Sequence, residues 1–314
     1  METKKQYLGI DVGGTFIKLG LVDGDGKVSL RREVAIDRSG NETVMETMTR
    51  GVDSFLLEHG LDALDLDGIG VSAAGCIDTA NGRVANNGGN VPGWPHTEVT
   101  GPLTEKYGLP ATIANDGNCV ALAEAWTGAA MGKDDVICVV LGTGVGGGII
   151  SGGRLIEGAR GFGGEIGHFP THAEKKPAFR GDLSPDYEKH AATSALVGLA
   201  AAEGCSWTNG REIFNAAAEG NSDALRILDE WMYEIAAGIV GLVHVFDPET
   251  VIIGGGVSAQ EDLLVKPLRE KILGMVQPDF ADGLEIKAAA LGNDAGMAGA
   301  VKYFIDSASR RQDQ

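Results

Sequence analysis

IDVGGT at residues 10–15, LGTGVGGG at residues 141–148 and VIIGGGV at residues 251–257 are the stretches that decide the fold of this chain. Each begins with β-branched or other apolar residues and runs into glycines, which places a turn at the end of a strand. Glycine lets backbone N–H groups approach an anion without obstruction by a Cβ atom, and a nearby threonine or lysine adds a donor or a positive charge. A single turn of this kind also joins strands in proteins that bind nothing. Three in this order indicate loops for phosphate or nucleotide.

The first two loops have similar surroundings, which suggests an old duplication. In each copy a strand leads into the loop, and a second strand, a turn and a third strand follow. Two such units facing each other across a cleft would hold a polyphosphate from both sides, which favours a nucleotide over a bare anion. The expected strands are residues 7–10, 16–22 and 27–34 in the first copy and 136–141, 148–151 and 154–157 in the second.

Length and charge narrow the class of protein. A chain of 314 residues exceeds the size at which one hydrophobic core stops growing, so we expect two domains. The net charge of −18 argues against a nucleic-acid partner, because binding to a phosphate backbone needs a basic face. The longest apolar run, residues 235–246, contains His244 and is too short to span a bilayer, and residues 1–6 do not resemble a signal peptide. The 4 cysteines show no C-x-x-C spacing, so we expect a cytoplasmic protein without a membrane partner.

Helical spacing of apolar residues organises the remaining motifs. It predicts helices over residues 42–59, with Gly60 as the stop, over residues 225–242 with an end before Asp247-Pro248, and directly after Asp294. Asn115 and Asp116 lie between the first two loops, where an apolar segment ends and another helix begins. Asp116 has two interpretations there: a helix N-cap, or a general base facing a substrate hydroxyl.

The motifs taken together resemble the ROK family of sugar kinases. The resemblance rests on the three glycine loops, on Asn115-Asp116, and on GEIGH at residues 164–168, and it runs from Tyr7 to about Ile305. It implies an α/β fold of the actin-like, hexokinase-type ATPase class, with two ribonuclease-H-like lobes and a central ligand cleft. We expect a small lobe of residues 1–117 plus 296–314 and a large lobe of residues 118–295.

The resemblance also implies roles for individual residues toward the sugar. Asp116 would be the catalytic base that takes the proton from the sugar 6-hydroxyl, and Asn115 would hydrogen-bond a sugar hydroxyl. Glu165 and His168 would contact ring hydroxyls near C1 to C3. The other substrate-binding residues that it implies are Asn90 and Glu188.

Toward the nucleotide, the resemblance implies ATP with Mg²⁺. The phosphates would lie against the first two loops, and Asp11 would orient Mg²⁺ through water. Lys18 fits either a phosphate contact or a surface position. The expected cofactor-binding residues are Asp11, Gly13, Gly14, Thr15, Lys18, Thr143, Gly144 and Gly146, with Gly254, Gly255 and Gly256 bordering the adenosine.

The chain departs from the family pattern where members usually carry a cysteine-rich structural zinc motif. Residues 177–186 contain no cysteine, so zinc bound by thiolates is excluded at this place. His168, His172 and His190 offer another ligand set, but we expect no structural zinc. A second departure is Ser72-Ala73-Ala74-Gly75, where the family often has a proline before the glycine.

The function implied is an ATP-dependent hexose 6-kinase, with glucose as the leading substrate. N-acetylmannosamine, N-acetylglucosamine, allose, fructose or a β-glucoside stay open as alternatives, and the resemblance further implies a homodimer. A non-catalytic sugar-sensing regulator is the alternative from another class. The family's repressors carry a helix-turn-helix domain ahead of the kinase-like region, and the ten residues before Asp11 are too few for one.

Overall fold

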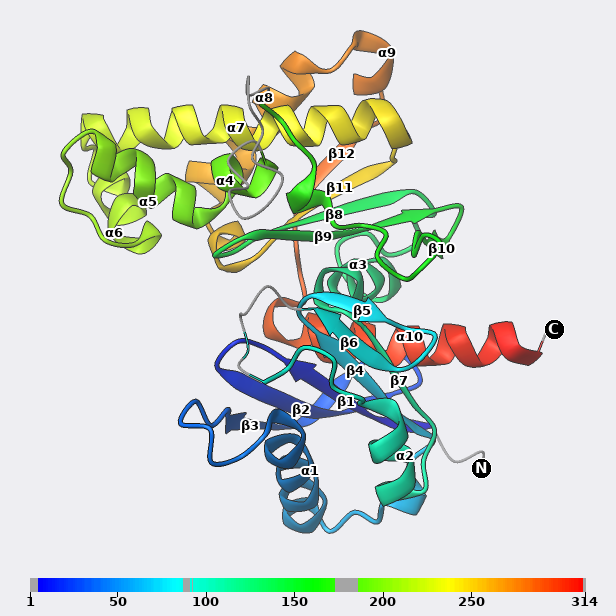
Figure 1. The fold of residues 1–314 in the computed structure, drawn as a ribbon. Helices are drawn as coiled ribbons and strands as arrows, with labels where there is room; N and C mark the ends of the chain where they lie inside the picture. The colour runs from blue at the N-terminus through cyan, green and yellow to red at the C-terminus, as the bar shows by residue number, and fades with distance from the viewer. Residues whose placement is uncertain (1–4, 87–90, 92, 173–185, 313–314) are drawn as a thin grey trace. The chain divides into compact units, whose positions relative to one another are not determined.

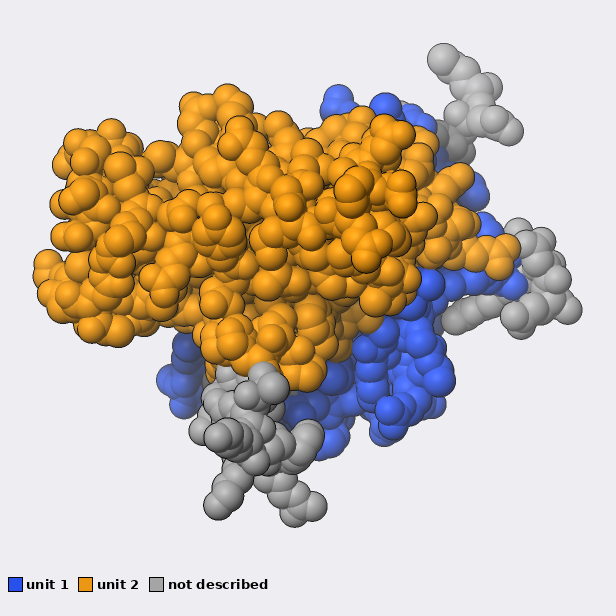
Figure 2. Space-filling model, turned by 90° about the horizontal axis from the view of Figure 1, so that it is seen from above, with its two compact units in different colours: residues 1–131, 156–163, 293–314 blue, residues 132–155, 164–292 orange. Residues whose placement is uncertain are grey.

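The computed structural model describes residues 5–86, 91, 93–172 and 186–312, and the chain forms two compact units. Unit 1 comprises residues 1–131, 156–163 and 293–314, and unit 2 comprises residues 132–155 and 164–292 (Figure 2). Relative to the expected lobes, unit 1 also includes residues 118–131, because α3 (Asp116–Trp126) packs against α10 (Ala295–Gln312). Residues 156–163 join unit 1 as well, since Glu157 accepts hydrogen bonds from Tyr303 and Arg310 of α10.

The sheet of unit 1 has the strand order β3-β2-β1-β4-β7. β1, β2 and β3 form an antiparallel meander, and β4 and β7 continue the sheet parallel to β1. The strands predicted around the first loop are confirmed, each within two residues at either end. The bounds are β1 (Gln6–Val12), β2 (Phe16–Asp23), β3 (Val28–Ala35), β4 (Gly68–Ala73) and β7 (Ala111–Asn115), with a separate hairpin of β5 (Cys76–Asp78) and β6 (Arg83–Asn86).

Helices cover both faces of this sheet (Figure 1). Successive residues of β2 show the alternation, because Leu19 packs toward α1 (Val44–His59) whereas Gly20 faces Met297 of α10. α1 ends as predicted at Gly60, whose φ of 62° is the left-handed conformation of a glycine C-cap. The remaining helical elements of unit 1 are α2 (Thr100–Tyr107), α3 and the 3₁₀ turn η1 (Ala63–Asp65).

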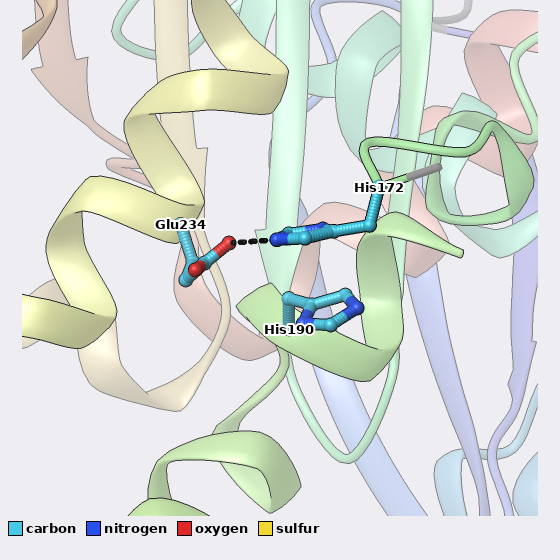
Figure 3. Close-up of side chains that lie close together, drawn as sticks. All are labelled: His172, His190 and Glu234. Carbon is cyan, nitrogen blue, oxygen red and sulfur yellow. Dashed lines mark ion pairs between the residues drawn. The ribbon is translucent and has the colours of Figure 1, made fainter. Parts of the chain in front are cut away.

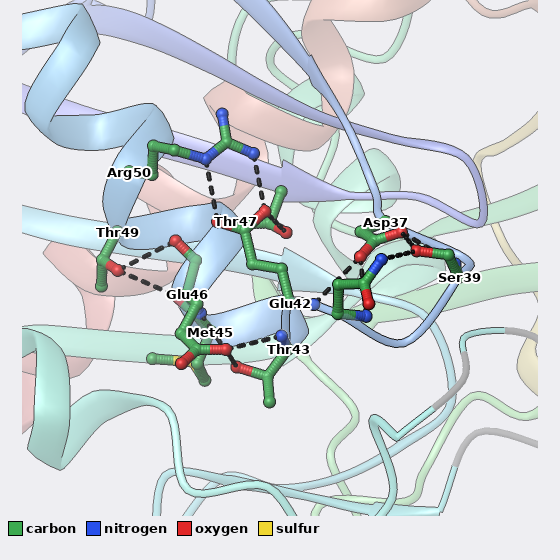
Figure 4. Close-up of polar contacts among 10 residues, drawn as sticks. Asp37, Ser39, Glu42, Thr43, Met45, Glu46, Thr47, Thr49 and Arg50 are labelled. Atoms are coloured by element: carbon green, nitrogen blue, oxygen red, sulfur yellow. Dashed lines mark hydrogen bonds and ion pairs between the residues drawn. The ribbon is translucent and has the colours of Figure 1, made fainter.

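A polar network fixes the start of α1 (Figure 4). Arg50 donates two hydrogen bonds to the Glu42 carboxylate, at 2.9 and 2.7 Å, and the Thr47 hydroxyl donates a third at 2.8 Å. These bonds stabilise the ionised carboxylate and lower the pKa of Glu42 to about 2. Thr43 and Glu46 form a capping box at the same place, so the helix begins two residues later than the predicted residue 42.

The sheet of unit 2 repeats the plan of unit 1 in the order β10-β9-β8-β11-β12. β8, β9 and β10 are antiparallel, and β11 and β12 extend the sheet parallel to β8, so the repeat predicted from the two glycine loops is confirmed. The bounds are β8 (Val136–Leu141), β9 (Val145–Ser151), β10 (Arg154–Leu155), β11 (Thr250–Gly254) and β12 (Glu285–Ala288).

In the sheet of unit 2, two strand ends differ from the predictions. β9 begins at Val145 and not at residue 148, so three glycines of the second run, residues 146–148, belong to a strand. A Cβ atom at Gly147 would lie 2.3 Å from the carbonyl oxygen of Cys138 and 2.4 Å from Cδ1 of Ile166. Close packing therefore accounts for Gly147. β10 ends at Leu155 and not at residue 157, because residues 156–163 belong to unit 1.

α7 (Ser222–Phe246) is the central helix of unit 2 and ends before Asp247, as predicted. Trp231 of α7 is fully buried, and its indole N–H donates to the carbonyl oxygens of Ala191 and Ala192. Tyr187 is also buried and donates to the carbonyl oxygen of Ile235 at 2.7 Å, so α4 (Tyr187–Ala191) is fixed against α7. The other helical elements of unit 2 are α5 (Thr193–Ala202), α6 (Gly210–Ala218), α8 (Lys266–Met275) and α9 (Pro278–Ala281), with η2 (Ile166–His168), η3 (Gly256–Ala259) and η4 (Glu261–Val265). The short turn η5 (Gly292–Asp294) lies where the chain passes from unit 2 to unit 1.

The length of α7 does not make it a membrane segment. Among the residues that the structure describes, no helix is both long and apolar enough to cross a bilayer.

Candidate active site

In unit 1, the candidate residues lie at the carboxyl edge of the three parallel strands. Asp11 of β1 is in register with Ser72 of β4, which is in register with Ala114 of β7. β7 then ends at Asn115, and α3 begins at Asp116. In open α/β sheets this edge is where ligands bind, because strand ends and helix starts present polar groups there.

Asp11 is held by two neighbours in unit 1. The Ser72 hydroxyl donates to Asp11 Oδ1 at 2.8 Å, and the Lys18 ammonium lies 3.6 Å from Oδ2. Lys18 also donates to the side chain of Asn293 at 3.3 Å. Lys18 lies directly opposite Asp11 on the neighbouring strand, and the choice between a phosphate contact and a surface position stays open. Ser72 was not singled out as a site residue, because a serine inside an apolar strand has no distinctive pattern.

Asn115, and not Asp116, caps α3. The Asn115 side-chain oxygen accepts from the Asn118 N–H at 3.1 Å, and its amide donates to the Gly75 carbonyl at 3.0 Å. The N-cap interpretation of Asp116 is therefore wrong, because capping falls to the residue before it. Asp116 is the first residue of the helix, and its Oδ1 accepts from the Gly117 N–H at 2.9 Å. The general-base interpretation of Asp116 stays a prediction.

The fully buried thiol of Cys119 feels the charges of Asp11 and Asp116. Burial raises the pKa of Cys119 well above its ordinary value, and the negative charges of Asp11 and Asp116 raise it further. The charges of Asp11 and Asp116 therefore both act on this one buried group of α3. Cys119 itself stays protonated and acts as a small apolar side chain.

In unit 2, the glycine turns follow the ends of β8 and β11. The turn after β8 is closed by a hydrogen bond from the Gly142 N–H to the Gly144 carbonyl at 2.9 Å, and Thr143 at its tip is exposed. Gly255 follows β11 with a φ of 90°, and a Cβ atom there would lie 2.1 Å from the Leu141 carbonyl oxygen. Only glycine fits this position, so the third loop packs directly against the end of β8.

Three polar side chains gather beside these turns. Glu188 of α4 approaches Gly144, since a Cβ atom on that glycine would lie 2.5 Å from Glu188 Oε2. Glu165 Oε2 lies 4.0 Å from His168 Nε2. Burial raises the pKa of Glu165, and Glu188 raises it further, while His168 acts in the opposite direction. The structure thus brings the predicted sugar residues Glu165, His168 and Glu188 together within unit 2, next to the second glycine turn.

Asp186 belongs to this group and was missed in the sequence. Its carboxylate Oδ2 lies 3.3 Å from His168 Nδ1, on the opposite side of the imidazole from Glu165. Asp186 is buried, with 7% of its surface exposed. An aspartate directly before a short helix is typical of an N-cap, so no signal in the sequence distinguished it.

The histidine set considered for a metal differs from what the structure brings together (Figure 3). His172 and His190 stack at 3.8 Å between ring centroids, and His172 Nε2 lies 3.6 Å from Glu234 Oε2 of α7. The three side chains offer ligand atoms within 4.8 Å of one another. His168 is not a member of this cluster, because it is paired with Asp186. Asn90 and residues 177–185 of the region without cysteines lie outside the described residues.

Comparison with known proteins gives a consistent result along the whole chain. The model of the ROK family matches residues 7–307. The glucokinase of Thermotoga maritima is 32% identical over 96% of this chain and 98% of its own. A β-glucoside kinase of Listeria monocytogenes is 30% identical over 96% of this chain and 98% of its own. Among solved structures, the ROK family glucokinase of Streptomyces griseus in complex with glucose and AMPPNP superimposes with a TM-score of 0.79 at 30% identity, covering 95% of this chain and 98% of that one.

Proposed function

The chain belongs to the ROK family and has the actin-like, hexokinase-type ATPase fold, and on that premise we propose that it is an ATP-dependent sugar kinase. It transfers the γ-phosphate of ATP to the 6-hydroxyl of a hexose, and glucose is the leading substrate. The observation that carries the proposal is the position of Asp116. It is the first residue of α3, which begins where β7 ends, at the same carboxyl edge of the unit 1 sheet that carries Asp11.

Asp116 is the general base in this proposal. Phosphoryl transfer asks a protein mainly for alignment and charge stabilisation, and a positioned carboxylate contributes typically 10²–10⁴ in rate by accepting the proton of the attacking hydroxyl. Asn115 caps the N-terminus of this helix, and it is the residue directly before the base. The capping by Asn115 supports this role, because it leaves the Asp116 carboxylate unneeded for the cap.

The nucleotide phosphates are assigned to the two glycine turns and their threonines, Thr15 and Thr143. Both threonines are exposed at the tips of their turns, where backbone N–H groups and a hydroxyl suit phosphate oxygens. The carboxylate of Asp11 fits Mg²⁺, which prefers hard oxygen ligands and keeps several waters. Such an ion, bound with ATP, would neutralise charge on the phosphates. Gly254, Gly255 and Gly256 are assigned to the adenosine.

The sugar hydroxyls are assigned to Glu165, His168 and Glu188, together with Asn90. A hydroxyl buried without a partner costs about 1–3 kcal/mol, so a cluster of acceptors is what a hexose ring requires. The raised pKa of Glu165 fits this assignment, because a carboxyl already withdrawn from water gains from a polyol that donates to it.

Glucose is the leading substrate because glucokinases stand among the most similar relatives, and one such structure holds glucose and AMPPNP. The β-glucoside kinase is nearly as similar, which keeps a β-glucoside as the main alternative. N-acetylmannosamine, N-acetylglucosamine, allose and fructose complete the set to be tested. We also propose a homodimer that acts in the cytoplasm, where ATP is available and the four free cysteines stay reduced.

A coupled ADP-release assay over this panel of sugars, with ATP and Mg²⁺, tests the proposal. We expect the highest kcat/KM with glucose, and 6-deoxyglucose should inhibit competitively without being phosphorylated. If glucose binds to the protein but none of the sugars leads to ADP release, the result would favour the sugar-sensing regulator. Activity confined to a β-glucoside would correct the substrate.

A further inference from the structure

We propose that Asp186 is a positioning residue for sugar recognition: it fixes the tautomer and the ring orientation of His168, so that Nε2 is presented to the sugar as a hydrogen-bond acceptor. The inference rests on the proposed function, since it deepens the role assigned to His168. It concerns only residues of unit 2.

The first observation is the geometry of the pair. Asp186 Oδ2 lies 3.3 Å from His168 Nδ1, within reach of a hydrogen bond. A carboxylate can only accept, so Nδ1 must carry the proton. In a neutral imidazole the other nitrogen, Nε2, is then an acceptor. Orientation of a histidine by a carboxylate on its second nitrogen is a general device for fixing which nitrogen stays available.

The second observation is that Asp186 gives up a helix cap to make this contact. It occupies the N-cap position of α4, where an aspartate side chain ordinarily accepts from the backbone N–H groups of the first turn. Here the side chain makes no capping hydrogen bond, and only the backbone carbonyl of Asp186 accepts, from the Lys189 N–H at 2.9 Å. The carboxylate is directed at His168 instead.

The third observation is that the segments carrying the pair are bonded to each other. Asp186 is 7% exposed and forms an isolated antiparallel bridge with Pro170. The next residue, Tyr187, stacks on Phe169 at 5.2 Å between ring centroids and donates a backbone hydrogen bond to the Phe169 carbonyl. Asp186 and His168 therefore each stand one residue from a stacked aromatic pair, which fixes their separation.

The result is a pair of hydrogen-bond acceptors, one on His168 and one on Glu165. Nε2 of His168 and Oε2 of Glu165 lie 4.0 Å apart, and with the proton on Nδ1 both atoms accept. Two acceptors at this separation suit the two O–H groups of a vicinal diol. With the other tautomer, the Nε2–H would point toward Glu165 and would offer a donor where the diol also donates. Asp186 thus selects a substrate that donates from two adjacent ring hydroxyls.

The test combines nitrogen NMR of the histidines with steady-state kinetics on the full chain. At pH 8, where an ordinary imidazole is neutral, we expect His168 of the parent to be protonated at Nδ1, with the signal assigned by its loss in His168→Gln. Asp186→Ala should shift the population toward the Nε2–H tautomer, whereas Asp186→Asn, whose side-chain oxygen still accepts, should keep the parent tautomer.

The kinetic arm separates positioning from general damage. Asp186→Ala should raise the KM for the sugar roughly three- to tenfold, because the competent tautomer would be populated only part of the time. The KM for ATP and the kcat should stay close to the parent values, and Asp186→Asn should restore most of the sugar KM. Equal rises in both KM values, or a loss in Asp186→Asn as large as in Asp186→Ala, would overturn the proposal.

The NMR measurement does not depend on the proposed kinase activity. If the parent phosphorylates no sugar, the kinase proposal fails, while the tautomer of His168 is still read directly. If Asp186→Ala does not fold, Asp186→Leu, which has nearly the same size and also cannot accept a hydrogen bond, takes its place. An Nε2–H tautomer in the parent, or an unchanged tautomer in a folded Asp186→Ala, would show that Asp186 does not set the state of His168.

Discussion

Replacement of Asp116 by asparagine separates chemistry from folding. Asparagine has nearly the same shape, and its side-chain oxygen can still accept from the Gly117 N–H, which Asp116 Oδ1 contacts at 2.9 Å. The helix cap is untouched, since Asn115 supplies it. The structural loss is then limited to one negative charge in the first turn of α3, about 0.3–1 kcal/mol from its interaction with the helix dipole.

The catalytic loss should be much larger. A general base contributes about 10²–10⁴ in rate, which corresponds to about 3–5 kcal/mol of transition-state stabilisation at roughly 1.4 kcal/mol per tenfold. Thermal unfolding should therefore change by little, sugar binding measured by tryptophan fluorescence should be retained, and kcat should fall by at least about a hundredfold.

Asp223 provides a matched control for this substitution. It is an exposed aspartate in the first turn of α7, so Asp223→Asn removes the same charge from the same kind of helix position. We expect a similar small stability change and an unchanged kcat. If Asp116→Asn turns over at a rate comparable to that of Asp223→Asn, Asp116 is not the base and the assignment of roles in unit 1 is refuted.

Three further changes test other parts of the account. Glu165→Gln should raise the KM for the sugar far more than the KM for ATP. Because the pKa of Glu165 is raised in the folded state, the stability linked to its protonated form is lost as pH rises through that pKa. The glutamine variant should therefore melt no lower than the parent at pH 8, and a lower melting temperature would contradict this. Glu42→Gln should lower the melting temperature at pH 7. Because a carboxyl with a lowered pKa stabilises the fold only while it is ionised, the difference in melting temperature from the parent should shrink as pH falls through about 2. A difference that does not depend on pH would exclude the network with Arg50 as its cause. EDTA should abolish kinase activity through Mg²⁺ and leave the melting temperature unchanged, whereas near-stoichiometric zinc in the purified protein would show that the histidines had replaced the missing thiolates.

Much of the fold could be predicted because its signals are local. Glycine turns after apolar strands placed the two repeated meanders, and apolar spacing with Gly60 and Asp247 placed the ends of α1 and α7. The start of β9 could not be predicted in the same way. Gly147 is required by Cys138 and Ile166, which approach it from other segments, and a glycine of this kind looks identical in sequence to one that turns the chain.

The candidate site shows the same limit. Asp116 and Glu165 stand in motifs that mark them, whereas Ser72 and Asp186 acquire their roles only from what lies next to them in the fold. The helix cap illustrates the difficulty, because neighbouring Asn115 and Asp116 are both good N-cap residues and only the backbone path decides between them. Glu234 could not be grouped with His172, since α7 brings it there from 62 positions further along the chain.

Phosphorus NMR of a reaction mixture of the protein, ATP, Mg²⁺ and glucose tests the central claim most directly. The account predicts that the γ-phosphate signal of ATP is replaced, one for one with ADP, by a phosphate monoester coupled to the two C6 protons of glucose. Inorganic phosphate as the only product, ATP left unchanged, or an ester on any other carbon of glucose would contradict it.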